Sequence, residues 1–125
     1  MGYTALTIDD DASARNLFSI ILKRVGFEVI TAEDADDALE KIADTTPDIV
    51  LTDVSLPGMD GIELTAMLRQ REAFANVPII VLSAFHEDAV VNRAMDAGAD
   101  AFYQKPLKPT DLHEKLEALI NARRA

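Results

Sequence analysis

The sequence contains no cysteine, which excludes disulfides, zinc–thiolate sites, iron–sulfur clusters and thiol nucleophiles. It also lacks long apolar runs, and no basic segment followed by an apolar one opens the chain. A membrane span needs about 20 consecutive apolar residues, so neither a span nor a signal peptide is expected. These absences together fit a cytoplasmic protein.

Positive charge is scarce as well. The chain has 12 Lys and Arg residues against 22 Asp and Glu residues, which gives a formal net charge of −10. Such an acidic surface repels a phosphate backbone or an anionic membrane, so we expect no direct binding of nucleic acid and no membrane association. Apolar residues are plentiful, at 49% of 125 residues, which argues against disorder. We expect residues 1–125 to form one domain around one core.

Short β-rich runs alternate along the chain with segments of helical periodicity. Strands are expected at residues 3–8, 28–31, 48–52, 78–82 and 100–104. Helices are expected at residues 14–25, 35–42, 62–69 and 87–97, and from Pro109 onward. Parallel neighbours need helical crossovers, so this alternation predicts an α/β fold with a doubly wound parallel sheet of five βα units.

Polar residues follow four of the five expected strands: Asp9–Asp11, Asp53, Ser83 and Lys105. In open parallel sheets the ligand site lies at the carboxyl ends of the strands, so these side chains should gather at one edge. Clustered carboxylates repel one another unless a cation lies between them, and Mg²⁺ suits oxygen ligands. A lysine and a hydroxyl would complement a phosphoryl group beside that cation. The pattern therefore predicts a joint metal and phosphate site.

Four motifs follow one another along the chain: Ile8-Asp9-Asp10, Asp53 before Leu56-Pro57-Gly58-Met59-Asp60-Gly61, Ser83-Ala84, and Lys105-Pro106. In this order they resemble the receiver domain of bacterial two-component response regulators, of the chemotaxis-regulator type. The resemblance extends from the first strand to the last helix. It implies a flavodoxin-like fold with strand order 2-1-3-4-5.

The resemblance assigns roles to the acidic residues. Asp53 matches the phosphoacceptor, whose carboxylate attacks the phosphoryl group of a phosphohistidine. Asp9, Asp10 and Asp53, with the backbone carbonyl of Ser55, match the ligands of Mg²⁺, with Mn²⁺ as an alternative ion. The domain would catalyse only its own phosphotransfer and autodephosphorylation, so the resemblance implies a signalling switch rather than an enzyme.

Other residues would carry the response to phosphorylation. Lys105 and Ser83 match the residues that bind the phosphoryl oxygens, and Phe102 matches a switch aromatic that rotates when Ser83 moves inward. The surface of the fourth helix, fifth strand and fifth helix would then change. Phe85 and Ser55 would flank the path of the hydrolytic water and so tune the lifetime of the phosphorylated state.

The resemblance also implies partners. The phosphoryl donor would be a histidine kinase or a histidine phosphotransfer protein, and the output would pass to a downstream effector domain or protein. A phosphorylation-dependent homodimer is a further partner that the family allows. The family's Lys-Pro bond is usually cis, and the same is expected at Lys105-Pro106.

Simpler structural roles are expected for several other residues. Asp11 and Asp34 precede helices and should cap them. His86 and His113 are expected at the surface. Met59 and Met67 should serve packing.

Three alternatives remain open. A Mg²⁺-dependent aspartyl-phosphate hydrolase also uses an aspartate nucleophile, but it usually has a second aspartate two positions later, where this chain has Ser55. A flavin-binding module would need a phosphate loop after the first strand, where an acidic triplet lies instead. A degenerate receiver that serves only for docking is the third alternative, although such domains typically lose the residues retained here.

Overall fold

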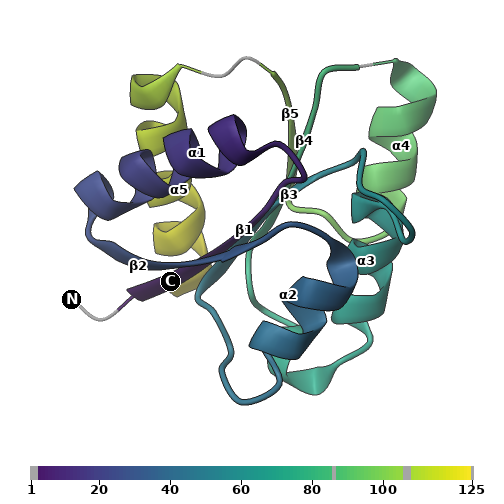
Figure 1. Cartoon of the computed structure of the whole chain (residues 1–125), viewed down its shortest axis with the longest axis horizontal. Coiled ribbons are helices and arrows are strands. Elements are labelled where there is room, and N and C mark those ends of the chain that lie inside the picture. Colours follow the sequence, from purple (N-terminus) through teal and green to yellow (C-terminus); the bar gives the residue numbers. More distant parts are fainter. Residues whose placement is uncertain (1–2, 86, 106–107, 125) are drawn as a thin grey trace.

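Five parallel strands form one sheet in the order β2-β1-β3-β4-β5, which confirms the predicted topology (Figure 1). The computed structural model describes residues 3–85, 87–105 and 108–124. The strands are β1 (Tyr3–Ile8), β2 (Phe27–Ala32), β3 (Ile49–Asp53), β4 (Ile79–Ser83) and β5 (Ala101–Gln104). The helices are α1 (Ala12–Val25), α2 (Ala35–Lys41), α3 (Gly61–Arg69), α4 (Asp88–Asp96) and α5 (Pro109–Arg124), with a 3-10 helix η1 (Glu72–Phe74).

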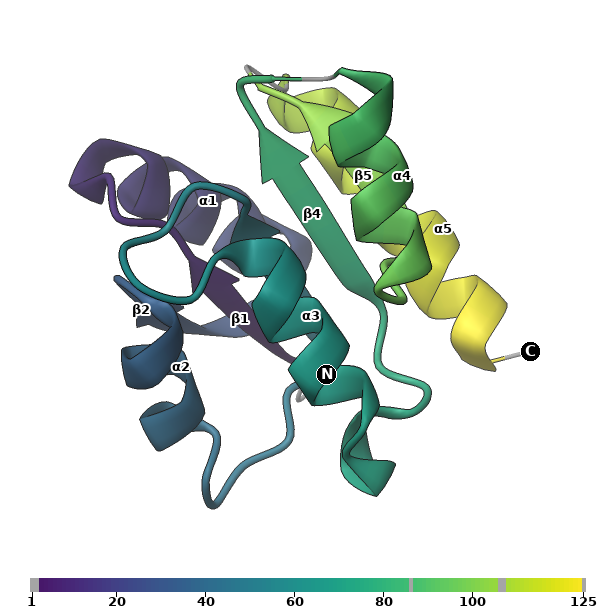
Figure 2. The same cartoon turned by 90° about the vertical axis from the view of Figure 1, so that its right-hand side faces the viewer.

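Helices cover both faces of the sheet, as Figure 2 shows with α3 and α4 in front of β4 and with α1 and α5 behind it. Each face has its own apolar cluster, one beneath α1 and α5 and the other beneath α2, α3 and α4. In β3, Ile49 and Leu51 belong to the α1/α5 cluster and Val50 to the other. Because β3 is buried on both faces, its sequence is the nearly continuous apolar run from which a central strand was predicted.

Three strands, β2, β3 and β4, extend one residue beyond their predicted ends, and in two of them the added residue is a predicted site residue. β3 ends at Asp53 and β4 at Ser83, so these polar residues are the last residues of their strands rather than the first residues of loops. The sheet continues to their level because Asp53 lies opposite Leu82 and Ser83 lies opposite Gln104. Both side chains therefore stand on the rigid edge of the sheet.

Aspartates begin three of the helices. The side chains of Asp11 and Asp34 accept hydrogen bonds from backbone N–H groups of α1 and α2, which confirms their predicted capping roles. Asp60 forms a capping box with Glu63 at the start of α3. Gly26 follows the last residue of α1 as its C-cap, and its φ of 104° lies in the left-handed region that glycine adopts without strain.

Other packing and surface expectations can be compared with the structure. His113 lies on the exposed side of α5, as predicted. Its Nε2 lies 2.7 Å from Oε1 of Glu117. Met59 is half-buried and packs against the cluster beneath α2, α3 and α4, and Met67 is half-buried in α3. Among the helices that the structure describes, none combines the length and apolar character needed to cross a membrane.

Candidate functional site

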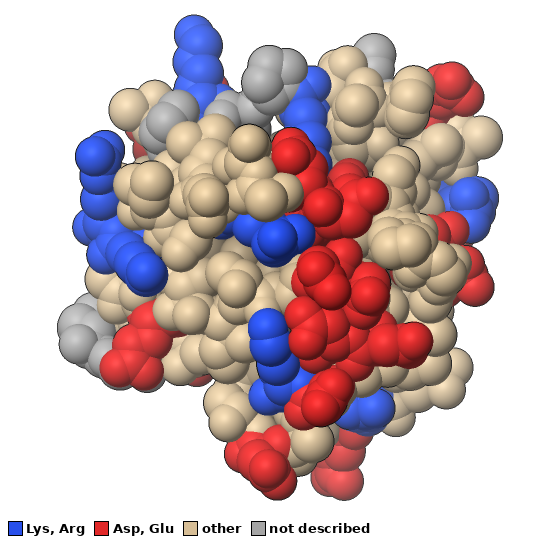
Figure 3. All heavy atoms as spheres, viewed as in Figure 1, with Lys and Arg blue, Asp and Glu red and all other residues tan. Residues whose placement is uncertain are grey.

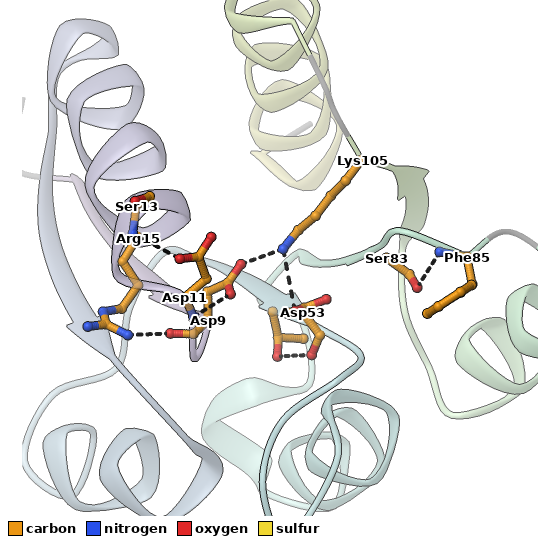
Figure 4. A network of polar contacts seen from close by, with 9 residues as sticks. Asp9, Asp11, Ser13, Arg15, Asp53, Ser83, Phe85 and Lys105 are labelled. Carbon is orange, nitrogen blue, oxygen red and sulfur yellow. Dashed lines mark hydrogen bonds and ion pairs between the residues drawn. The ribbon is translucent and has the colours of Figure 1, made fainter.

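The register of the sheet brings the predicted site residues to one edge. Ile8 pairs with Thr52, and Asp53 pairs with Leu82, so Asp9 follows β1 at the level at which β3 ends. Lys105 follows β5, and its backbone N–H donates to the carbonyl of Ser83 over 2.8 Å. Residues more than forty positions apart in the sequence therefore become neighbours (Figure 4).

Three carboxylates form the centre of this edge. Asp9 is 2% exposed and Asp53 is 8% exposed, whereas Asp10 is open to solvent. Each offers an oxygen atom, and these oxygens lie within 4.8 Å of one another. A compact set of carboxylate oxygens with one side open to water fits a hard divalent cation such as Mg²⁺, which retains several water ligands.

Lys105 bridges two of these carboxylates. Its Nζ lies 2.5 Å from Oδ2 of Asp9 and 3.4 Å from Oδ2 of Asp53. The same Nζ lies 6.0 Å from the centre of the Phe18 ring on α1. The ammonium group therefore stands beside the position that a group attached to Asp53 would occupy (Figure 4).

The charges of the site shift two pKa values. Burial raises the pKa of Asp53 above its ordinary value and the Asp9 carboxylate adds to this rise, which outweighs the opposing effects of Lys105 and the Ser55 backbone. Burial lowers the pKa of Lys105, but the hydrogen bond to Asp9 and the charges of both carboxylates outweigh it and leave that pKa raised. The site therefore stabilises the charge of its lysine more than that of its central carboxylate.

Asp9 is held at each of its polar groups. Its backbone N–H donates to the carbonyl of Ala32 over 3.1 Å, and its Oδ1 accepts from the N–H of Asp11 over 3.0 Å. Its backbone carbonyl accepts from Nη1 of Arg15 over 2.7 Å. The sequence interpretation did not include Arg15, although a cation in the first turns of a helix that follows three aspartates was a signal for it.

The backbone of Asp53 is confined by the start of α3. The Oγ1 of Thr52 donates to the Asp53 carbonyl over 3.0 Å, and the N–H of Gly61 donates to the carbonyl of Val54 over 2.9 Å. A Cβ atom on Gly61 would lie only 2.0 Å from the Asp53 carbonyl oxygen. The sequence interpretation took Gly61 for part of a turn and missed this close approach.

The predicted switch residues lie at the far side of the same edge. Ser83 is buried, and its Oγ accepts a hydrogen bond from the N–H of Phe85 over 3.0 Å. Within the described part of the chain, no hydrogen bond joins the Ser83 side chain to Asp53. Phe102 is half-buried and packs against the apolar cluster beneath α2, α3 and α4, whereas Phe85 is 62% exposed.

Some expectations have no counterpart in the described contacts. Ser55 is exposed, and the metal-ligand role of its carbonyl stays a prediction. His86 and the Lys105-Pro106 bond lie outside the described residues, so their expectations also stay predictions.

Acidic side chains extend beyond the metal site. Figure 3 shows them gathered in a band down the middle of the view, over the loop between β1 and α1 and over α2. The first turn of α2 contributes Asp36 and Asp37 to the acidic residues of this region. The local potential around the three carboxylates is therefore strongly negative, which favours cations.

A sheet of order 2-1-3-4-5 with an acidic site and a paired lysine at its carboxyl edge defines the receiver class of signalling domains. Residues 5–117 match the response regulator receiver domain. The chain belongs to this family and is a CheY-like receiver with an acidic metal-binding site.

Curated relatives and solved structures agree with this assignment. The phosphate regulon transcriptional regulatory protein PhoB of Pseudomonas aeruginosa is 36% identical over 120 residues, which cover 96% of this chain and 52% of PhoB. Protein PilG of the same organism is 36% identical over 121 residues, covering 95% of this chain and 88% of PilG. A CheY-like receiver domain protein from Methanospirillum hungatei has a TM-score of 0.92 at 28% identity and covers 99% of this chain and 98% of its own. The chain thus spans about half the length of PhoB and most of PilG.

Proposed function

We propose that residues 1–125 form one phosphorylation-activated switch that accepts a phosphoryl group on Asp53 in a Mg²⁺-dependent reaction. The observation that supports this most directly is the grouping of Asp9, Asp10 and Asp53, with the ammonium group of Lys105 against two of them, Asp9 and Asp53. Receivers are typically signalling phosphoacceptors rather than enzymes, and they generally act in the cytoplasm. We extend both properties to this chain.

The proposed transfer uses the Asp53 carboxylate as the nucleophile. Its oxygen forms a bond to phosphorus while the phosphorus–nitrogen bond of a phosphohistidine breaks, and the electron pair of that bond stays with the donor imidazole. Lys105, already 3.4 Å from Oδ2 of Asp53, would offset the charge of the phosphoryl oxygens. Asp9, Asp10 and Asp53, with the Ser55 carbonyl, would hold the Mg²⁺, which neutralises phosphoryl charge when bound.

The proposed switch then acts through Ser83. A phosphoryl group on Asp53 offers new acceptors to the Ser83 hydroxyl, which now meets only the N–H of Phe85 among its described side-chain contacts. Inward movement of Ser83 would leave space for Phe102, whose ring is half-buried at present. The surface of α4, β5 and α5 would change as a result, and the phosphoryl group would bias this two-state equilibrium.

The proposed partners follow from the family. A histidine kinase or a histidine phosphotransfer protein would supply the phosphoryl group, and a downstream effector domain or protein would read the changed surface. A homodimer that forms on phosphorylation is one form such reading could take. No contact with nucleic acid or a membrane is proposed for this segment, since its net charge is −10.

Incubation with acetyl phosphate and Mg²⁺, followed by intact-mass spectrometry, tests the proposal. We expect one phosphoryl adduct on the wild-type chain and none on Asp53→Asn, which keeps the shape of the side chain but removes the nucleophile. Asp44→Asn is the matched control, because Asp44 is an exposed aspartate in the turn after α2. An adduct that survives in Asp53→Asn would contradict the proposal.

The rival hydrolase gives a different result in the same assay. Continuous turnover of an added phosphomonoester by the wild-type chain would favour a Mg²⁺-dependent aspartyl-phosphate hydrolase over a receiver. The conformational part needs a separate measurement, in which beryllofluoride and Mg²⁺ stand in for the phosphoryl group. We expect the amide signals around Phe102 to shift, and unchanged signals there would contradict the switch.

Phe85 and Ser55 are proposed to set the lifetime of the phosphorylated state. Phe85 is 62% exposed beside Ser83, where its ring could hinder the approach of water to the acyl phosphate. We expect Phe85→Ala to speed the decay of the adduct, measured by mass spectrometry after donor removal. Met95→Ala is the control, because it truncates an exposed apolar side chain that lies on α4, and it should leave the decay rate unchanged. Equal decay rates of Phe85→Ala and wild type would refute this role.

A further inference from the structure

Arg15 contacts the acidic site through the backbone of Asp9. It lies in α1, where its backbone N–H donates to the carbonyl of Asp11 over 3.0 Å. Helical side chains lean toward the N-terminus of their helix, and the Arg15 guanidinium follows this direction back to the loop after β1. There its Nη1 donates to the backbone carbonyl of Asp9 over 2.7 Å (Figure 4).

The position of this arginine is electrostatically unusual. The positive end of the helix dipole favours anions near a helix N-terminus, and α1 has no acidic residue in its first turn. Arg15 instead brings a cation close to that end. A residue that goes against the electrostatic preference of its own helix is expected where a functional site needs that residue.

The bond from Arg15 acts on the peptide group that joins two of the three acidic residues. The carbonyl oxygen of Asp9 belongs to the peptide plane that leads directly to Asp10, so fixing that oxygen fixes the direction in which Asp10 leaves the strand. Asp9 itself is buried and held by β2 and Lys105, but Asp10 is exposed. The position of Asp10 therefore depends more on this peptide plane than on packing.

We propose that Arg15 is a positioning residue that holds the Asp9–Asp10 peptide plane and thereby preorganises the two carboxylates for Mg²⁺. This inference rests on the metal requirement of the proposed function. Carboxylates that repel one another spread apart unless the backbone holds them, and ordering them on binding lowers the affinity for the ion. Contacts that orient the ligands of a metal typically change its affinity by about 10-fold to 100-fold.

The hydrogen bond from Arg15 to a backbone carbonyl indicates a role beyond charge neutralisation. Arg15 borders a small polar hollow of about 130 Å³ that is lined also by Thr31, Ala32, Glu33, Asp37 and Lys41. Acidic residues thus lie near the guanidinium on the side of β2 and α2 as well. A cation that served only to neutralise Asp9 and Asp10 would need no directed bond to a backbone carbonyl.

Titration with Mg²⁺ at constant ionic strength tests the inference, with the amide signals of Asp9–Asp11 and Asp53 as the readout. We expect Arg15→Ala to weaken Mg²⁺ binding about tenfold and Arg15→Lys to recover part of the loss, because lysine can donate one hydrogen bond. Arg24→Ala is the matched control, since it removes the same charge from the far end of α1. It should bind Mg²⁺ as the wild type does.

Two results would overturn the inference. If charge alone matters, the loss of a cation makes the site more negative, so Arg15→Ala would bind Mg²⁺ as tightly as the control or more tightly. If Arg15 acts through its packing and not through a hydrogen bond, Arg15→Lys would bind Mg²⁺ as weakly as Arg15→Ala. The amide spectrum of Arg15→Ala shows whether this variant folds. If it does not fold, Arg15→Lys alone tests the inference, and we expect its Mg²⁺ affinity to fall by less than tenfold. A normal Mg²⁺ affinity of Arg15→Lys would then overturn the inference.

The titration also separates this inference from the proposed function. It uses Mg²⁺ alone, without a phosphoryl donor. A wild-type chain that binds Mg²⁺ but forms no adduct contradicts the proposed function and leaves the role of Arg15 intact. A wild-type chain that forms the adduct while Arg15→Ala binds Mg²⁺ normally contradicts only the role of Arg15, and a wild-type chain that binds no Mg²⁺ contradicts both.

Discussion

Ionisation of the Asp53 carboxyl group costs free energy in the folded protein. Burial raises its pKa, the Asp9 charge adds to the rise, and Lys105 offsets only part of it. A raised pKa in the folded state means that ionised Asp53 destabilises the fold relative to its protonated form. The proposed reaction needs Asp53 as an anion, and its buried surroundings disfavour that anion. A bound cation would offset this cost.

The first prediction follows from this cost. In EDTA at neutral pH, Asp53→Asn should need more urea to unfold than the wild type, because the amide carries no charge. Below the ordinary pKa of aspartate both folded and unfolded wild type are protonated, so the two proteins should be equally stable. The wild type should lose its stability relative to the variant as the pH rises through the raised pKa.

Two outcomes would count against this prediction. One is a variant that is no more stable than the wild type at neutral pH. The other is an equal gain in Asp44→Asn, which removes an exposed charge from the turn after α2 and reports only the general self-repulsion of an acidic chain.

The residues of the site differ in how far the sequence could predict them. Asp53 and Ser83 could be found because each ends a buried strand, and the carboxyl ends of parallel strands share one edge. For Arg15 the sequence offers only a weak signal, a cation in the first turns of the helix after three aspartates, because its role depends on one side chain folding back onto a carbonyl six positions earlier. Helical periodicity describes which face a residue occupies and does not describe such a bond.

At the scale of elements, the start of α3 lies directly against the backbone of Asp53. The capping box of Asp60 and Glu63 fixes where this helix begins, and Gly61 is its first residue. The absence of a side chain at Gly61 allows the helix to approach the end of β3. The position of Asp53, the proposed phosphoacceptor, therefore depends on an element that contributes no carboxylate to the metal site.

The second prediction concerns this approach. A Cβ atom in Gly61→Ala would lie 2.0 Å from the Asp53 carbonyl oxygen, so α3 or β3 must shift. We expect a loss of about 1–3 kcal/mol in the free energy of unfolding, measured with urea, as for other overpacked sites. We also expect slower formation of the acetyl phosphate adduct, because the Asp53 carboxylate moves with its backbone.

Gly58→Asn is the control for this substitution. Gly58 belongs to the loop before α3, has φ of 75° and has no atom within 4 Å of an added Cβ. Asparagine tolerates this left-handed conformation. Gly58→Asn should form the adduct at nearly the normal rate. If Gly61→Ala matched it in rate and stability, the close approach to Asp53 would be unimportant.

Element positions followed from periodicity, but some connections between elements did not. Arg69 at the end of α3 donates to the carbonyls of Phe74, Val77 and Gly98 and pairs with Asp100 at 2.6 Å. The sequence shows only a polar residue at the end of a helix, because the acceptors lie on three separate segments. The short helix η1, whose Phe74 is buried, was not predicted either, because three residues are too few to show a helical periodicity.

At the scale of the molecule, the negative charge is unevenly placed. The net charge of −10 was evidence against contact with nucleic acid, and the fold brings three of these carboxylates within 4.8 Å. Lys105 pairs with two of these carboxylates, but one lysine offsets only part of the mutual repulsion of three. Sequence composition gives the total charge but cannot give this local concentration, which depends on the sheet register.

The last prediction is that Mg²⁺ stabilises the whole fold by binding this concentration of charge. Binding to the native state alone adds RT ln(1 + [Mg²⁺]/Kd) to the free energy of unfolding, about 1.4 kcal/mol at ten times Kd. Urea unfolding with and without MgCl₂, at ionic strength matched with NaCl, measures this gain apart from general screening. Asp10→Asn should lose most of the gain, because Asp10 is an exposed member of the cluster whose replacement disturbs no buried contact. If NaCl alone produced the same stabilisation, or if Asp10→Asn kept it in full, the ion would be screening the surface rather than binding at Asp9, Asp10 and Asp53.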